Sequence, residues 1–292
     1  MTRDKRVQFD FDIAFSNGGG LTGRAFRLDI DGDDIDDAAL AAYVVQDLRL
    51  LMVGEVRISN KSILREAHKR TATSARFVDL SHTIEHGMIT YKGLPAPLIC
   101  DHLSREKSKT VYAPGTEFQI GRIDMVANTG TYIDSPFHRY ADGADVADFD
   151  LDAIGLVDAL VVRVAGATSR AISHRAFDGL DVRGKAVLVH TGWDRHWRTD
   201  QYFENHPFLT ADAAALLRDA GARLVGIDSF NIDDTADLER SVHTTLLGAG
   251  IPIVEHLCEL QNVPASGLRF SAVPPKVRGM GTFPVRAFAL CD

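Results

Sequence analysis

From Phe77 to the C-terminus, short apolar runs alternate with segments of helical periodicity, and this alternation strongly constrains the fold of the 292-residue chain. Short apolar runs are typical of strands buried on both faces, whereas apolar residues three or four positions apart are typical of helices. The alternation therefore predicts an α/β domain with a largely buried sheet. The expected strands are residues 159–164, 186–190, 223–227 and 251–254, and the expected helices are residues 210–220 and 239–247.

The first 75 residues have a different pattern. Residues 7–15 and 24–30 alternate on either side of the glycine-rich segment 16–20, which indicates a β-hairpin. Good helix formers with a spacing near 3.6 predict a helix over residues 38–52. The polar segment 66–74 is typical of a linker. We therefore expect a small α+β N-terminal extension over residues 1–75 and the main domain over residues 76–292.

Composition and charge exclude several classes of protein. Lys and Arg total 32 and Asp and Glu total 40, so the formal net charge is −8 at pH 7, which is not typical of a nucleic-acid-binding chain. No apolar run approaches the roughly 18 residues of a membrane span, and the N-terminal residues lack the apolar stretch of a secretion signal. The three cysteines form no CxxC pair. We expect a cytoplasmic protein that binds a small molecule, and neither nucleic acid nor a membrane.

Four polar residues of one parity gather in the segment 128–138. Asn128, Tyr132, Asp134 and His138 are separated by even numbers of residues, so an extended strand would direct all four side chains to one side. Pro136 stops ladder pairing and bends the chain. The segment therefore predicts a polar cavity with His138 at its edge, although a simple ion pair between Asp134 and His138 would explain the same spacing.

Two further ionisable residues lie on expected elements of the second half of the chain. His243 falls within the expected helix 239–247, and Glu255 directly follows the apolar run 251–254. A carboxylate at the edge of the core needs a partner because an unpaired buried charge is expensive. A salt bridge between His243 and Glu255 would supply that partner.

Together these residues resemble the cyclase-type metal hydrolases, the family that includes bacterial kynurenine formamidase and isatin hydrolase. The family signature HxGTHxDxPxH is matched over residues 128–138, with Asn128 and Tyr132 in place of its first two histidines. In the family a helical histidine and a strand-end glutamate follow, as His243 and Glu255 do here. The resemblance covers about residues 77–290 and includes the motifs Asp79-Leu-Ser-His82, Thr191-Gly-Trp193 and Gly226-Ile-Asp-Ser229.

The resemblance implies a swivelling β/α/β fold, a divalent metal such as zinc or manganese, and a homo-oligomer, either a dimer or a tetramer. By position it implies Asp134, His243 and Glu255 as metal ligands and His138 as a proton shuttle. An amide oxygen is a weaker ligand than imidazole, and a phenol with a pKa of about 10 must lose its proton to coordinate. With Asn128 and Tyr132 in the first two positions, we therefore expect one metal per chain, because three protein ligands and an open position are usual for a catalytic zinc.

The predicted activity is hydrolysis of a non-peptide C–N or C–O bond, in a formamide, a cyclic amide or a lactone, by metal-activated water. Asp134 would coordinate the metal and orient the reactants, and His138 would pass a proton to the leaving group. Tyr132 and Asn128 would donate hydrogen bonds to the developing oxyanion.

An aromatic substrate would need an apolar wall, and Trp193 and Phe118 are candidates for it, although plain packing in the core is the more ordinary explanation for Trp193. Two alternative functions remain at this point. One is a metal-independent lyase, dehydratase or cyclase in which His138 acts as the base and Asp134 orients it. The other is a catalytically degenerate relative that binds a small molecule.

Overall fold

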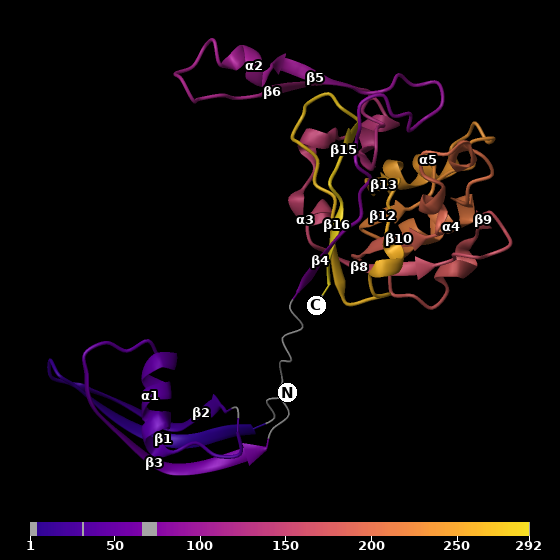
Figure 1. Cartoon of the computed structure of the whole chain (residues 1–292). Helices are drawn as coiled ribbons and strands as arrows, with labels where there is room; N and C mark the ends of the chain where they lie inside the picture. The colour runs from indigo at the N-terminus through magenta and orange to yellow at the C-terminus, as the bar shows by residue number, and fades with distance from the viewer. Residues whose placement is uncertain (1–4, 31, 66–74, 292) are drawn as a thin grey trace. The chain divides into compact units, whose positions relative to one another are not determined.

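The computed structural model describes residues 5–30, 32–65 and 75–291. The chain divides into two compact units, Met1–Thr73 and Ser74–Asp292 (Figure 1). Among the described residues, no helix has the length and apolar character needed to cross a membrane.

The first unit is a three-stranded antiparallel sheet with one helix. β1 (Lys5–Phe15) pairs with β2 (Gly20–Asp29) in the expected hairpin, and its other edge pairs with β3 (Val53–Arg65). Every second side chain of β1 from Val7 to Ile13 is buried. These side chains form a core with Leu40 and Val44 of the helix α1 (Asp37–Asp47).

The helix α1 is shorter than the sequence pattern predicts. It begins after Asp36, whose carboxylate accepts a hydrogen bond from the backbone N–H of Ala39 at 2.8 Å, and its last residue is Asp47. Arg49 and Met52 have φ values of 51° and 59°, which turn the chain out of the helix and into β3, a strand that the pattern did not predict. The predicted linker, residues 66–74, lies outside the described residues.

The second unit contains a nine-stranded mixed sheet with the order β15-β7-β13-β12-β10-β8-β14-β16-β4 (Figure 1). Its centre consists of the four parallel strands that the apolar runs predict, which confirms the α/β class. These strands are β8 (Val157–Arg163), β10 (Ala186–His190), β12 (Leu224–Ile227) and β13 (Ile253–Glu255). The antiparallel flanking strands are β4 (Arg76–Asp79), β7 (Tyr132–Asp134), β14 (Leu268–Ser271), β15 (Thr282–Pro284) and β16 (Phe288–Cys291).

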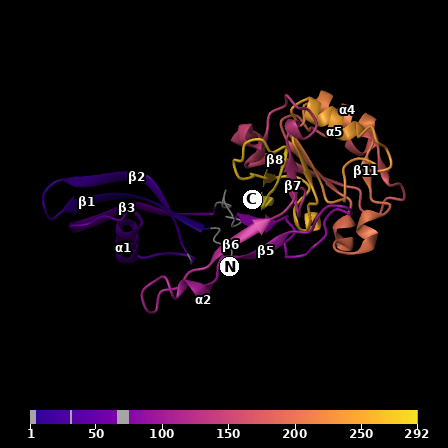
Figure 2. The same cartoon turned by 90° about the horizontal axis from the view of Figure 1, so that it is seen from above.

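Both faces of the parallel strands are buried. In β8, Leu160 and Val162 belong to the core that also contains side chains of α4 (Ala211–Ala220) and α5 (Ser241–Gly248), which lie side by side (Figure 2). Ala159 and Val161 belong to a second core on the other face. The bounds of α4 agree with the predicted range 210–220, and the helix is followed by Gly221 in the left-handed conformation. The Thr210 hydroxyl donates to the Ile172 carbonyl and does not cap the helix.

The remaining elements are short. β5 (Leu98–Leu103) and β6 (Ile120–Asp124) form a separate antiparallel ribbon whose side chains are mostly exposed, with α2 (Arg105–Ser108) in the connection between them. β9 (Ala171–Ile172) pairs with β11 (Phe208–Leu209), and α3 (Leu151–Ile154) precedes β8.

Candidate active site

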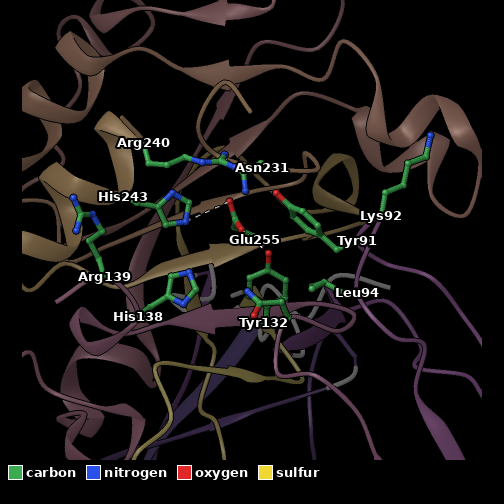
Figure 3. A pocket seen from close by; sticks show the side chains of 12 residues that line it. Tyr91, Lys92, Leu94, Tyr132, His138, Arg139, Asn231, Arg240, His243 and Glu255 are labelled. Carbon is green, nitrogen blue, oxygen red and sulfur yellow. Dashed lines mark hydrogen bonds and ion pairs between the residues drawn. The ribbon is translucent and has the colours of Figure 1, made fainter. Parts of the chain in front are cut away.

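Strand pairing and one helix bring the predicted polar residues together. β7 pairs with β13, so that Tyr132 lies opposite Glu255, and β15 pairs with the other edge of β7, so that Thr282 lies opposite Asp134. α5 adds His243. The resulting pocket has a volume of about 410 Å³ (Figure 3) and is lined by Tyr91, Lys92, Gly93, Leu94, Asn128, Tyr132, His138, Arg139, Asn231, Arg240, His243 and Glu255.

Only part of the segment 128–138 is extended. Gly130 precedes β7 with a φ of 67°, and a Cβ at this position would lie 2.8 Å from Ile84 Cγ1, so the turn requires glycine. After β7, Pro136 begins a 3-10 turn that ends at His138, a position where its fixed φ and missing N–H are tolerated. The prediction from strand parity is therefore wrong for Asn128 and His138, which reach the pocket because of these turns.

His243 is oriented by a carboxylate that the sequence analysis missed. Its Nδ1 lies 2.6 Å from Asp233 Oδ2, and the same carboxylate accepts hydrogen bonds from the backbone N–H groups of Val242 and His243 at the start of α5. A proton held on Nδ1 leaves Nε2 directed at Asp134 Oδ2, 3.7 Å away. Asp233 lies eight residues before the first residue of α5, and Asp234, Asp237 and Glu239 lie closer to the helix, so no local sequence pattern pointed to it.

The carboxylates around His243 favour its protonated form although the side chain is buried. Burial lowers the pKa of His243, but the carboxylates of Asp134 and Asp233 and the charge of Glu255 outweigh burial and raise its pKa to about 10. The surrounding negative charge thus stabilises a cation at this place. A metal ion would compete with the proton for binding to the His243 imidazole.

A threonine joins Asp134 to His138. Thr282 Oγ1 donates its proton to Asp134 Oδ1, and it lies 2.9 Å from His138 Nδ1. Because the single hydroxyl proton is given to the carboxylate, the hydroxyl accepts from His138, which places the imidazole proton on Nδ1 and leaves Nε2 as a base. Thr282 lies 148 residues from Asp134 in the chain, and no local sequence pattern pointed to it.

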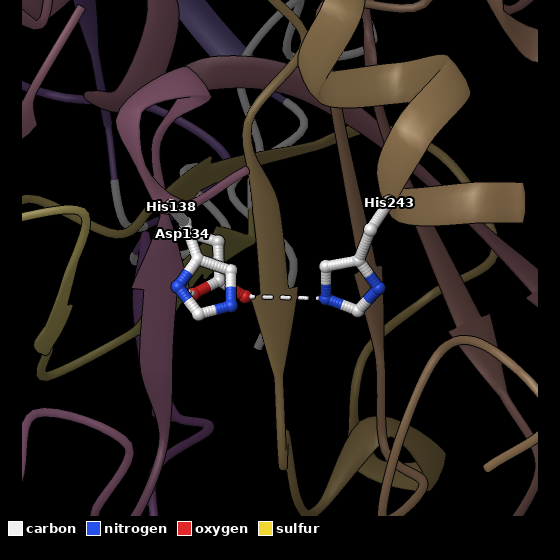
Figure 4. A group of neighbouring side chains, drawn as sticks. All are labelled: Asp134, His138 and His243. Carbon is white, nitrogen blue, oxygen red and sulfur yellow. Dashed lines mark ion pairs between the residues drawn. The ribbon is translucent and has the colours of Figure 1, made fainter. Parts of the chain in front are cut away.

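Three of the predicted residues form a candidate cation site. Asp134, His138 and His243 each place a ligand atom within 4.8 Å of the others (Figure 4). Asp134 Oδ2 is buried and has no hydrogen-bond partner within the described part of the chain, an arrangement that is costly unless a cation or a proton satisfies the oxygen. A carboxylate and imidazoles are suitable ligands for a divalent transition metal, so the residues fit such an ion.

Glu255 lies beside this group and is bound to Tyr132. Its Oε2 accepts from the Tyr132 hydroxyl at 2.6 Å, its Oε1 accepts from the Ile232 N–H at 2.6 Å, and Oε1 lies 3.9 Å from His243 Nε2 (Figure 3). Burial, followed by the charges of Glu255 and Asp134, raises the pKa of Tyr132 well above its usual value, so the phenol is neutral. Its single proton is engaged by Glu255, so in this arrangement Tyr132 does not donate to a substrate oxygen as predicted, and Asn128 is left as the candidate donor.

The two predicted wall residues do not line this pocket. The Trp193 indole N–H donates to the Tyr202 carbonyl at 3.0 Å, and its ring packs against His196. Phe118 packs edge-on against Tyr112 and is 52% exposed. The aromatic wall is formed by Tyr91, whose ring lies 4.6 Å from that of Phe230.

Comparison with known proteins identifies the family of this chain. The family model named Cyclase matches residues 78–234. The chain belongs to the cyclase family. This match begins in β4, so the first unit lies outside it, and it ends before His243 and Glu255.

Individual relatives match a larger share of the chain than the family model does. Kynurenine formamidase from Bacillus cereus is 28% identical over 216 residues, which cover 73% of this chain and 97% of the relative. A solved structure described as a potential metal-dependent hydrolase with cyclase activity is 27% identical, covers 75% of this chain and 99% of its own, and has a TM-score of 0.62. Isatin hydrolase A from Labrenzia aggregata, at 20% identity, has a TM-score of 0.63 and covers 74% of this chain and 94% of its own. The predicted family and its β/α/β fold are confirmed.

Proposed function

We propose that this cyclase-family chain is a hydrolase that cleaves the C–N bond of a formamide or a cyclic amide, or the C–O bond of a lactone, with one zinc or manganese ion per chain. The observation that carries the proposal is the convergence of two proposed ligands, Asp134 and His243, and the proposed base His138 around a buried oxygen of Asp134 that has no hydrogen-bond partner among the described residues. The similarity to kynurenine formamidase over 97% of its length supports an amide as the substrate.

In this proposal Asp134, His243 and Glu255 hold the cation. Asp233 fixes the ring of His243, and the Tyr132 hydroxyl and the Ile232 N–H fix the carboxylate of Glu255. When bound, the metal supplies a Lewis acid that polarises the carbonyl and lowers the pKa of water.

His138 moves the proton. Its Nδ1–H is donated to Thr282, so Nε2 is free to accept a proton from the attacking water and later to return it to the leaving nitrogen. The side chain lies exposed at the edge of the pocket, where it can reach a bound substrate. The Asn128 amide, in the same pocket, donates a hydrogen bond to the developing oxyanion.

The test combines elemental analysis of protein purified without added metal with hydrolysis assays on N-formyl aromatic amines, cyclic amides and lactones. We expect about one tightly held ion per chain, and activity that is lost with a chelator and restored by zinc or manganese. His138→Gln should lower kcat by about 10²–10⁴-fold and keep the metal.

Three outcomes would contradict parts of the proposal. Chelator-resistant activity that still needs His138 would favour the metal-independent acid–base mechanism, and no turnover of any of these carbonyl compounds would contradict hydrolysis. Glu255→Gln should weaken metal retention far more than Asn128→Ala. Loss of the metal in His138→Gln, with retention in Glu255→Gln, would show that His138 is the third ligand in place of Glu255.

A further inference from the structure

An arginine at the start of α5 lines the same pocket and has no role in the chemistry described above. Arg240 is half-buried and adopts φ 50° and ψ 54°, a left-handed conformation that is uncommon for a residue with a side chain. Its Nη1 donates to Asn231 Oδ1 at 3.1 Å. Unusual backbone conformations of this kind are frequent at binding sites, where they aim a side chain.

Among the described residues, Arg240 forms no ion pair with a carboxylate, whereas several other arginines of this chain do. Arg198 contacts Glu85 at 2.6 Å and Arg286 contacts Asp79 at 2.7 Å, as expected in a chain with more acidic than basic residues. Across the described residues, no carboxylate lies within 4.0 Å of the Arg240 guanidinium. The guanidinium therefore makes no ion pair with Glu255 or Asp134, and a half-buried cation without a counter-ion faces a pocket built for a substrate.

The surroundings of Arg240 select the kind of anion. In Figure 3 its guanidinium points toward Asn231 and the hydroxyl end of Tyr91, above Glu255, while His138 and Tyr132 lie below Glu255. A planar guanidinium binds a carboxylate through two parallel hydrogen bonds. The Tyr91 ring beside it supplies a flat apolar surface for an aromatic group.

We propose that Arg240 recognises a carboxylate of the substrate, on a part of the molecule away from the scissile carbonyl. This inference rests on the proposed hydrolase function and narrows the substrates to anionic aromatic amides. Arg240 offsets the repulsion that the carboxylates of Asp134 and Glu255 exert on an anionic substrate, in addition to the positive charges of Lys92 and Arg139 in the pocket lining. The arginine is thus a specificity residue that admits a substrate of the same sign as the pocket carboxylates.

The test uses matched substrates that differ only in charge. The ortho, meta and para isomers of formamidobenzoate are each compared with the corresponding formamidobenzamide. We expect kcat/KM to favour at least one benzoate over its amide by about 10- to 100-fold, mainly through KM. Arg240→Gln should reduce this preference to less than about threefold by raising KM for the benzoate alone, and Arg240→Lys should restore part of it.

Arg139→Gln is the matched control for loss of charge at the pocket. Arg139 is exposed, stacks over Tyr140 and contacts the Thr244 hydroxyl, so its replacement should leave most of the preference in place. A preference that survives Arg240→Gln, or that Arg139→Gln removes equally, would overturn the proposal.

Calorimetric binding of the aminobenzoates and aminobenzamides separates this inference from the proposed activity, because it needs no turnover. We expect the anion to bind at least about tenfold more tightly to the unaltered chain and no more tightly than the amide to Arg240→Gln. Equal affinity in the unaltered chain would overturn the anion site even if the formamides are hydrolysed. Preferential anion binding without any hydrolysis would support the site and contradict the hydrolase. Should Arg240→Gln fail to fold, Arg240→Lys provides the comparison.

Discussion

Two buried histidines near Glu255 have different surroundings, since one faces the pocket and the other lies among aromatic rings. His243, 7% exposed, has Asp233, Asp134 and Glu255 within 4.0 Å of its ring nitrogens. His256, fully buried and next to Glu255 in the chain, packs against the rings of Tyr132, Trp197, Tyr202 and Phe230. Among the residues that the structure describes, neither of its ring nitrogens has a hydrogen-bond partner.

The comparison shows that partners, and not burial, set the charge of each histidine. Burial lowers the pKa of both, but carboxylates raise that of His243 to about 10, whereas His256 falls to about 3 because the neighbouring His82 and His206 add to the effect of burial. Burial likewise lowers the pKa of His82, whose ring stacks on that of Trp197 with centroids 3.8 Å apart, to about 4. On the pocket side His243 is therefore a cation, whereas on the aromatic side, around His256, the histidine rings are neutral.

The largest expected effect distinguishes the two histidines by activity. His243→Gln should lower kcat/KM by about 10³-fold or more, because it removes a group that holds the reactive centre. His256→Phe, which replaces one buried ring with another, should lower it by less than about tenfold. The comparison breaks down if steady-state kinetics give equal losses for the two variants.

A smaller effect is expected from the carboxylate that orients His243. Asp233→Asn keeps an oxygen that can cap α5 but removes the charge, and it should lower kcat/KM about 10- to 100-fold. The neighbouring Asp234→Asn is the control, because the Asp234 carboxylate accepts from the Ala236 N–H at the surface and Asp234 is not among the residues that line the pocket. Comparable losses in both variants would argue against a specific role for Asp233.

The aromatic side should make the fold sensitive to acid. The pKa of His256 in the folded chain, about 3, is below its ordinary value of 6.5, so the unfolded chain binds the proton first as the pH falls. The stability that a neutral His256 allows is complete above pH 6.5 and decreases toward pH 3, with a loss of about 2 kcal/mol at pH 5. Urea unfolding at pH 7 and pH 5 should show this loss in the unaltered chain relative to His256→Phe. If the free energy of unfolding changed equally with pH in the unaltered chain and in His256→Phe, protonation of His256 would not reduce stability.

The smallest effect concerns Trp193, which is bonded to Tyr202, one of the rings around His256 on the aromatic side. Trp193→Phe loses the hydrogen bond to the Tyr202 carbonyl and should reduce the free energy of unfolding by about 1 kcal/mol. Its effect on kcat/KM should stay below about threefold, because the indole does not line the pocket. A large rise in KM with unchanged stability would instead place Trp193 at the substrate.

Aromatic composition could not indicate which side of the site a ring belongs to. Trp193 and Phe118 were predicted as pocket walls because they are large and apolar, but such residues pack wherever apolar surface must be buried. Tyr91, the ring that does line the pocket, lies in the irregular stretch before β5, where no periodicity reports its direction. Thr282, Asp233 and Arg240 likewise act through contacts that depend on how the chain folds back on itself.

The amino-acid sequence was sufficient for the central parallel strands, for α4 and for the family, because apolar periodicity reports burial locally and the signature residues keep their order along the chain. Tertiary structure decided the contact of His138 with Thr282, the orientation of His243 and the engagement of Tyr132 by Glu255. Each of these depends on a hydrogen bond whose partner is set by strand register or by the path of a loop, and such geometry is not encoded in the spacing of residues on a single strand.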